Sequence, residues 1–158
     1  MAKKHKQNEN TNAVRKSSGA VVFYIDGFDR VQIMLVRSTS GNSWCFPKGG
    51  IEDHLNSRTN AIKEVYEEAG VIGDLGETLL RYKYKKGGVR QHVTLYAMEL
   101  AHELNEYPEA HMRSRIWVNA GDAYKYLSKE LAQALDELYD LLVDQGRSVI
   151  YDVSPSPV

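Results

Sequence analysis

The chain has 158 residues, 42% of them hydrophobic, and a formal net charge of −1. This length and composition fit one soluble domain that can bury a core, and a net charge near zero argues against general nucleic-acid binding. The apolar runs are shorter than the roughly 20 residues of a membrane-spanning helix, and the first residues do not resemble a secretory signal. The only cysteine, Cys45, excludes an internal disulfide and a cysteine-based zinc site. We therefore expect a cytoplasmic protein.

The first half of the chain predicts a tail, a hairpin and a shaped loop, in that order. Residues 1–16 are polar and rich in Lys, Asn and Gln, which predicts a flexible tail before a single domain over residues 17–145. Residues 19–25 and 31–37 are rich in β-branched side chains and flank a short polar turn, so they predict two antiparallel strands. Residues 44–50 contain Pro47 and two adjacent glycines, a composition typical of a loop rather than of regular structure.

A helix is predicted directly after this loop. Asn56 or Ser57 can cap its start, and Gly70 is a good C-terminal stop. At about 100° per residue, the helix has an apolar side and an acidic side. The apolar side carries Ala61, Ile62, Val65, Tyr66 and Ala69, and the acidic side carries Glu64, Glu67 and Glu68.

The second half predicts a further hairpin, a short strand and a last helix. Residues 77–85 and 89–100 alternate in type around a glycine pair, as the two strands of a hairpin do, and residues 115–119 form another short strand. Leucines at helical spacing predict a helix over residues 128–143 with a buried stripe. Residues 146–158 are predicted to be a C-terminal tail.

The acidic helix face is the first candidate for chemistry. Three carboxylates at positions i, i+3 and i+4 repel one another unless they are protonated, solvated or bridged by a cation. Oxygen ligands suit Mg²⁺ or Mn²⁺. Taken alone, such a face is more often a solvated acidic surface than a metal site. The glycine-rich loop before the helix favours the metal site, because its free backbone groups can closely approach a metal ion or a phosphate.

Residues 49–71 resemble the 23-residue Nudix box, Gly-x5-Glu-x7-Arg-Glu-apolar-x-Glu-Glu-x-Gly-apolar. The flanking residues 44–52 and 67–71 are most similar to the diphosphoinositol polyphosphate phosphohydrolase branch, with diadenosine polyphosphate hydrolases close behind. The resemblance implies an α/β/α sandwich with a mixed β-sheet between helices. It also implies Mg²⁺-dependent hydrolysis, with Mn²⁺ as a possible substitute, of a diphosphate linkage in a phosphorylated small molecule. Seven of the nine fixed positions match: Gly49, Glu64, Val65, Glu67, Glu68, Gly70 and Val71.

The resemblance also assigns roles to residues of the motif. It implies that a metal ion lowers the pKa of a water molecule that attacks phosphorus, and that a nearby glutamate takes the proton. This base is Glu67 or Glu68, or lies outside the motif at Glu106 or Glu109. The metal ligands that it implies are Glu64, Glu67, Glu68 and the carbonyl of Gly49.

Two positions depart from the motif. Leu55 stands where the family has its first glutamate, and Lys63 stands where it has arginine. Those two family residues commonly form an ion pair, so their joint loss indicates that the pair is replaced. Lys63, which we keep in the catalytic set, can reach Glu67 one turn later, although lysine cannot make the bidentate contact of arginine. Two functions stay open: an active hydrolase, or a weak or inactive Nudix domain that binds phosphate ligands.

The second predicted hairpin carries a cluster of cations. The two-residue period of a strand places Arg81, Lys83 and Lys85 on one face, and Arg90, His92 and Thr94 share a face of the partner strand. This is either a solvated sheet face or a cationic cradle for a densely phosphorylated substrate. A nucleotide substrate such as ADP-ribose, a nucleoside triphosphate or an RNA cap would need an aromatic or apolar slot instead. The predicted substrate-binding residues are Lys48, Gly50, Arg37, Lys83, Lys85, Arg90 and His92.

Overall fold

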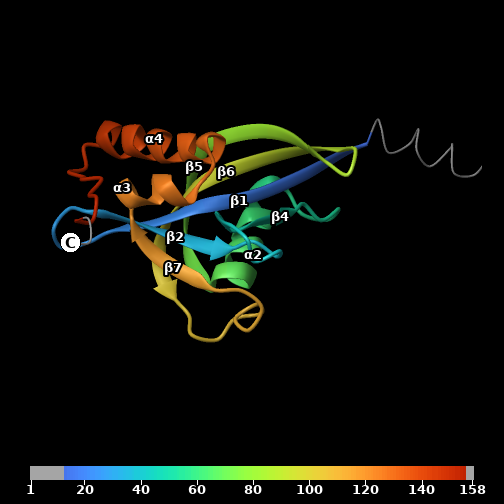
Figure 1. The fold of residues 1–158 in the computed structure, drawn as a ribbon, viewed down its shortest axis with the longest axis horizontal. Coiled ribbons are helices and arrows are strands. Elements are labelled where there is room, and N and C mark those ends of the chain that lie inside the picture. Colours follow the sequence, from blue (N-terminus) through green and yellow to red (C-terminus); the bar gives the residue numbers. More distant parts are fainter. Residues whose placement is uncertain (1–12, 156–158) are drawn as a thin grey trace, which may run out of the picture.

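A seven-stranded mixed sheet runs through the centre of the structure, a computed structural model in which residues 13–155 are described (Figure 1). Five strands lie in the order β3-β2-β1-β6-β5, while β4 pairs with β1 and β7 pairs with β2. The pair β1 and β6 is parallel and the other pairs are antiparallel. The strands are β1 (Val14–Ile25), β2 (Val31–Arg37), β3 (Trp44–Cys45), β4 (Lys48–Gly50), β5 (Val71–Lys86), β6 (Val89–Glu103) and β7 (Arg115–Asn119).

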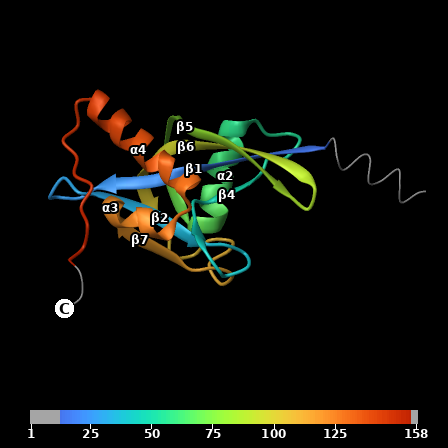
Figure 2. The same ribbon diagram turned by 45° about the horizontal axis from the view of Figure 1, so that its top comes forward.

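Helices cover both faces of this sheet, as Figures 1 and 2 show from two directions. Helix α2 (Ser57–Ala69) lies on one face, and α3 (Ala120–Ala123), the 3-10 helix η1 (Tyr124–Tyr126) and α4 (Lys129–Asp144) lie on the other. Strand β1 contributes side chains to the core on each face of the sheet. Ala20 and Val22 pack toward α2, while Val21 and Phe23 pack toward α4. Burial on both faces explains the continuous apolar run of this strand. The predicted α/β/α sandwich with a mixed sheet is therefore confirmed.

Local signals in the sequence set the ends of the two long helices. The Asn56 side chain accepts a hydrogen bond from the backbone N–H of Thr59 at 2.8 Å, and Gly70 ends α2 in the left-handed region at φ 64°. Ser128 caps α4 in the same way, accepting from the N–H of Leu131 at 3.3 Å. The helices predicted from residues 56–70 and 128–143 are both present. On the leucine stripe of α4, Leu135, Leu138 and Leu142 are buried and Leu131 is half-buried.

The second hairpin is longer than predicted. Strand β5 begins at Val71, immediately after the end of α2, and register shifts toward β6 accommodate its glycine-containing first part. At the turn, Gly87 and Gly88 have φ values of 57° and 78°, which a two-residue hairpin connection requires. In both views the hairpin and the start of β1 extend past the helices as a three-stranded arm (Figure 2).

The boundary of the predicted N-terminal tail is wrong by a few residues. Strand β1 begins at Val14, so Arg15 and Lys16 belong to the sheet. Parallel pairing holds them, with Val14 opposite Arg90 and Lys16 opposite His92. Composition does not predict this, because the first three residues of the strand are exposed and two of them are charged. The rest of the predicted tail, residues 1–12, lies outside the described residues.

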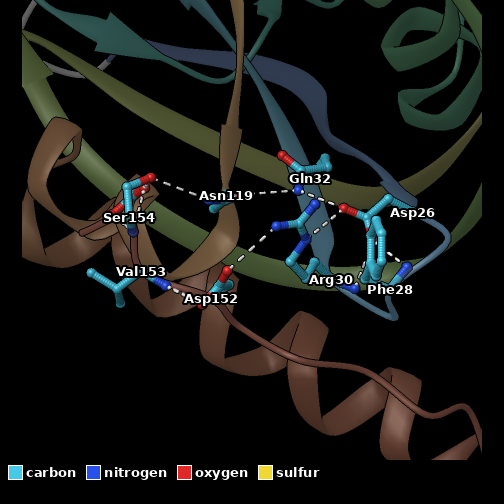
Figure 3. Close-up of polar contacts among 9 residues, drawn as sticks. Asp26, Phe28, Arg30, Gln32, Asn119, Asp152, Val153 and Ser154 are labelled. Carbon is cyan, nitrogen blue, oxygen red and sulfur yellow. Dashed lines mark hydrogen bonds and ion pairs between the residues drawn. The ribbon is translucent and has the colours of Figure 1, made fainter.

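Much of the predicted C-terminal tail also packs against the domain. The Arg147 guanidinium donates to both carboxylate oxygens of Glu99 at 2.8 and 2.7 Å, and the backbone of Ile150 bonds to residues 29 and 31. Figure 3 shows Ser154 joined through Asn119 and Gln32 to Asp26, which also holds the first turn. These polar contacts, together with Val149 and Tyr151 packed on the core, order the segment. Residues 156–158 lie outside the described residues, and no helix of the described chain has the length and apolarity to cross a membrane.

Candidate active site

One buried side chain joins the glycine loop, strand β1 and helix α2. Asn60, fully buried in α2, donates from Nδ2 to Ser18 Oγ at 3.1 Å and to the Gly49 carbonyl at 3.2 Å. Its Oδ1 accepts from the backbone N–H of Glu52 at 3.4 Å. On the other side of the loop, the Pro47 carbonyl accepts from the Ala20 N–H at 3.1 Å. These contacts fix the loop against the first turns of the helix.

Two carboxyl groups of α2 lie under this loop. The Glu64 carboxylate packs so closely on Gly49 that a Cβ atom there would overlap it. Glu68 is only 5% exposed, and its Oε1 lies 3.4 Å from the Lys48 N–H and 3.3 Å from Arg113 Nη1. Burial raises the pKa of Glu68 to about 8. The charge of Arg113 opposes this rise, and a hydrogen bond to Glu64 adds to it. Without a cation, the Glu64 and Glu68 pair therefore binds a proton more readily than an ordinary carboxyl group does.

Leu55 and Lys63 cannot form the ion pair of the family motif, and another residue supplies the missing carboxylate. Lys63 Nζ lies 2.9 Å from Glu67 Oε2, as predicted, and 3.0 Å from Glu52 Oε1. Hydrogen bonds to these two carboxylates raise the pKa of Lys63. Glu52 thus supplies, three positions earlier, the loop carboxylate that Leu55 lacks. The glycine loop stays tied to α2 by a charged contact in spite of both substitutions.

The three predicted metal-binding carboxylates are not equally placed. Glu64 and Glu68 lie together, whereas Glu67 turns toward Lys63. Within residues 13–155, no three acidic, histidine or cysteine side chains converge into a preformed metal site. The donor set nevertheless fits a hard divalent cation: two adjacent carboxylates, one of them buried, repel unless a cation or a proton separates them, and all donors are oxygen. The metal site stays a prediction.

A cavity of about 520 Å³ opens directly on Glu68. Tyr84 forms part of its wall, with its ring stacked on Tyr82 at a centroid distance of 6.0 Å and with Lys48 Nζ 5.7 Å from the ring centre. Four cations surround a single carboxyl group, which makes the cavity electropositive. Its charged lining residues are Arg15, Lys48, Glu68, Lys86 and Arg113, and its polar ones include Ser17, Ser38, Thr39 and Gln91.

Three of these cations are not among the predicted site residues. Arg15 falls in the predicted tail, Lys86 in the predicted turn, and Arg113 in the stretch before β7 for which no element is predicted. Alternation along β1 and β5 is a signal that could have found the first two. Arg113 had no such signal, because long-range contacts place it: it bonds the Arg37 carbonyl at 3.2 Å and pairs with Glu109 at 2.9 Å.

The two glutamates proposed as a base outside the motif differ in position. The Glu109 N–H donates to the Glu67 carbonyl at 2.9 Å, and its carboxylate shares Arg113 with Glu68. Glu106 is exposed in the same connection between β6 and β7. Of these two, Glu109 is the residue that the fold brings to the acidic helix.

Most of the predicted cationic cradle lies on the wrong face. Lys83 and His92 line a separate cleft beside the start of α2, on the sheet face opposite the cavity. Lys85 and Arg90 lie two residues further along the same strands and so share that face. The alternation was correct, but it could not tell which face lines the cavity; Tyr84 and Lys86 are on the cavity side.

Arg37 was also expected to bind substrate, and its side chain is engaged elsewhere. Its Nη1 donates to the Gly41 carbonyl at 2.6 Å, and its guanidinium lies 4.8 Å from the centre of the Trp44 ring. Only its carbonyl contributes to the site, by orienting Arg113. Lys48 and Gly50, by contrast, line the cavity, and their role in substrate binding stays a prediction.

Comparison with known proteins agrees with this geometry. The NUDIX domain family matches residues 15–142. The chain belongs to the Nudix family. It is 37% identical over 95 residues to Nudix hydrolase 4 of Arabidopsis thaliana, covering 59% of this chain and 46% of that protein, so the chain spans about half the length of this relative.

Two further proteins cover more of this Nudix chain. Over 146 residues it is 27% identical to diphosphoinositol polyphosphate phosphohydrolase 3-beta of Bos taurus, which covers 90% of this chain and 87% of that protein. The crystal structure of a C. elegans Ap4A hydrolase binary complex superposes with a TM-score of 0.73 at 18% identity, covering 82% and 98% of the two chains. This last similarity is one of fold.

Proposed function

We propose that this Nudix protein hydrolyses a diphosphate linkage in a polyphosphorylated small molecule, with Mg²⁺ as its cofactor. One observation carries the proposal: a cavity with four cations opens on Glu68, whose carboxyl group is hydrogen-bonded to that of Glu64. A small-molecule cavity of this size and charge suits clustered phosphates. The bovine relative and the nematode structure, both named for enzymes that act on diphosphate-containing compounds, agree with this chemistry.

In this proposal the acidic residues bind the cation and the basic residues of the cavity bind the substrate. Glu64, Glu68 and the Gly49 carbonyl would hold the cation, which would neutralise phosphate charge and lower the pKa of a water molecule. Arg15, Lys48 and Lys86 would bind phosphate oxygens from the cavity walls. These side chains neutralise the substrate and orient it toward the acidic helix.

We assign the proton-accepting role to Glu109. Its carboxylate is held by Arg113 at 2.9 Å, next to Glu68 but outside the group that would bind the cation. A carboxylate in that place can take a proton without giving up a metal ligand. Arg113 is then a positioning residue, since it fixes Glu68 and Glu109 relative to each other.

A specific observation favours a nucleotide substrate as the second candidate. The Tyr84 ring is 36% exposed at the cavity and backed by Tyr82, which gives a flat surface on which a base could stack. A diadenosine polyphosphate would use this ring, whereas an inositol pyrophosphate would depend on the cations alone. Replacing Tyr84 with alanine should therefore impair only the nucleotide reaction.

The test is a substrate panel with Mg²⁺ and with Mn²⁺. It contains a diphosphoinositol polyphosphate, diadenosine polyphosphates, nucleoside triphosphates, ADP-ribose and capped RNA. We expect cleavage of one of the first two classes, and a loss of about 100-fold or more in Glu68→Gln. The matched control, Glu137→Gln on the exposed side of α4, should keep full activity. An unchanged rate in Glu68→Gln would refute the metal assignment, and no cleavage of any substrate by the wild type would favour a binding module without turnover.

A further inference from the structure

The sheet face opposite the active cavity carries a second concentration of positive charge. On the arm formed by β1, β5 and β6, alternate residues point to the side of α2. We call this surface the back face and define it by six basic residues. They are Lys16, Arg81, Lys83, Lys85, Arg90 and His92.

The register of the strands places these residues in rows. Lys16, His92 and Lys83 are direct partners across the three strands, and Arg90 is opposite Lys85 in the next row. Rows two residues apart are separated by about 7 Å along the strands, and neighbouring strands by about 5 Å. The positive charges therefore cover a compact two-dimensional patch.

Like charges directly opposite on neighbouring strands repel, so this arrangement destabilises the fold unless negative charge nearby compensates for it. In the described part of the chain, none of the six residues takes part in an ion pair. The neighbouring carboxylate, Glu52, lines an adjacent cavity with Lys16 but is bound to Lys63 at 3.0 Å. The compensating negative charge is not supplied by the described residues.

The back face also contains a cleft. A cleft of about 300 Å³ lies between the strands and the start of α2, and none of the described residues that line it is acidic. Its border toward α2 is rigid: Ser57 Oγ accepts from Tyr96 Oη at 2.8 Å, and the Ser57 carbonyl accepts from Ser18 Oγ at 2.7 Å. Basic residues on three strands therefore surround a fixed hollow of small-molecule size.

We propose that the back face is a second anion-binding site, which binds a small molecule carrying several phosphate groups. The chemistry of the cleft favours such a ligand over RNA. Single-stranded nucleic acids bind by stacking bases on aromatic rings. The aromatic side chains closest to the cleft are unavailable for this: Tyr96 is 6% exposed, and the Tyr82 ring packs on the opposite core and stacks on Tyr84. A compact polyanion needs only the charges.

The test measures binding and turnover separately. Inositol hexakisphosphate and inorganic tripolyphosphate serve as probes in calorimetric titrations with EDTA present, so that no metal-dependent binding contributes. The titrations use a Lys48→Gln/Lys86→Gln background, which weakens the active cavity. In this background Arg81→Gln/Lys83→Gln should lower the affinity for at least one probe about tenfold or more. The control pair, Lys125→Gln/Lys129→Gln beside α4, should leave it unchanged.

Measurements of Tm and of turnover distinguish a loss of binding from a loss of folding in this variant. Without ligand, Arg81→Gln/Lys83→Gln should melt at or above the wild-type Tm, because repulsion between the strands is relieved. With inositol hexakisphosphate, the wild-type Tm should rise more than that of the variant. In the otherwise wild-type protein, this variant should also keep its turnover at saturating substrate.

Preference for one probe distinguishes a cyclic polyol phosphate from a linear phosphate chain, and either preference supports the site. Equal affinities of the two proteins for both probes would overturn it. So would tighter binding of a single-stranded RNA of equal charge, or loss of turnover together with binding, which would assign the back face to the active cavity. If no substrate is hydrolysed by any variant, the binding result still stands, so the proposed function and this site can fail independently.

Discussion

Charge balance around Glu68 is the central feature at the scale of single residues. Its carboxyl group is buried, faces one guanidinium and lies among other carboxylates. Arg113 offsets part of this cost, and either a proton or a divalent cation offsets the rest. Lys63 plays the matching role for Glu52 and Glu67 at the exposed side of the helix. Lys63 thus keeps a carboxylate partner in the loop, although that partner is Glu52 rather than a residue at position 55.

This balance predicts that cation binding depends on pH. Without a cation the pKa of Glu68 is about 8, so Mg²⁺ has to displace a proton at any lower pH. The apparent affinity for Mg²⁺ or Mn²⁺ should therefore rise up to about tenfold per pH unit below pH 8 and level off above it. Calorimetric titration in buffers of different ionisation enthalpy would also count the released proton. In Glu68→Gln this pH dependence should disappear; if it persists, another group controls binding.

At the scale of elements, the predictable parts are those with local signals. Helix α2 was found from its caps, and β7 was found from its β-branched core. The start of β5 was missed, because bulges let a glycine-containing stretch pair with β6. Alternation correctly grouped the cations on each strand but did not reveal which sheet face lines the cavity. Arg113 and the docked C-terminal segment depend on contacts between residues far apart in sequence, which no local pattern contains.

The docked C-terminal segment gives the second prediction. Hydrogen bonds from Ser154 hold the pKa of Asp122 below its usual range, helped by Lys125. An acid with a lowered folded pKa stabilises the fold above its unfolded pKa, and this contribution is lost as the pH falls through the folded value. Asp122→Asn at neutral pH should therefore resemble the wild type at acidic pH, with faster amide exchange in residues 150–155. Asp140→Asn on the exposed side of α4 serves as a control for charge.

Amide exchange that stays equally slow in Asp122→Asn would show that other contacts hold the segment. The double hydrogen bond between Arg147 and Glu99 is the first of these to examine. Arg147→Gln combined with Asp122→Asn should then release residues 147–155 together. An additive effect on exchange would identify two independent anchors along one segment.

At the scale of the whole molecule, the three-stranded arm joins two surfaces of different character. Its cavity side presents Tyr84 and Lys86, and its other side, toward the start of α2, is the basic back face. Because side chains alternate, one pair of strands serves both surfaces without a shared side chain. The position of both therefore depends on the turn at the tip of the hairpin, far from the core of the sandwich (Figure 2).

This dependence predicts a selective effect of substitutions at the tip. Gly87→Ala/Gly88→Ala adds side chains at φ values of 57° and 78° where nothing else lies within 4 Å, so the change strains the turn without a steric clash. The strain, about 1 kcal/mol per residue, should distort the outer arm and displace Lys86 and Tyr84. We expect a several-fold rise in KM, little change in kcat and a slightly lower Tm. Gly27→Ala, in the open turn at the other end of the sheet, has ordinary φ and should change neither constant. A loss of kcat with unchanged KM would instead mean that the arm orders the acidic helix rather than the substrate.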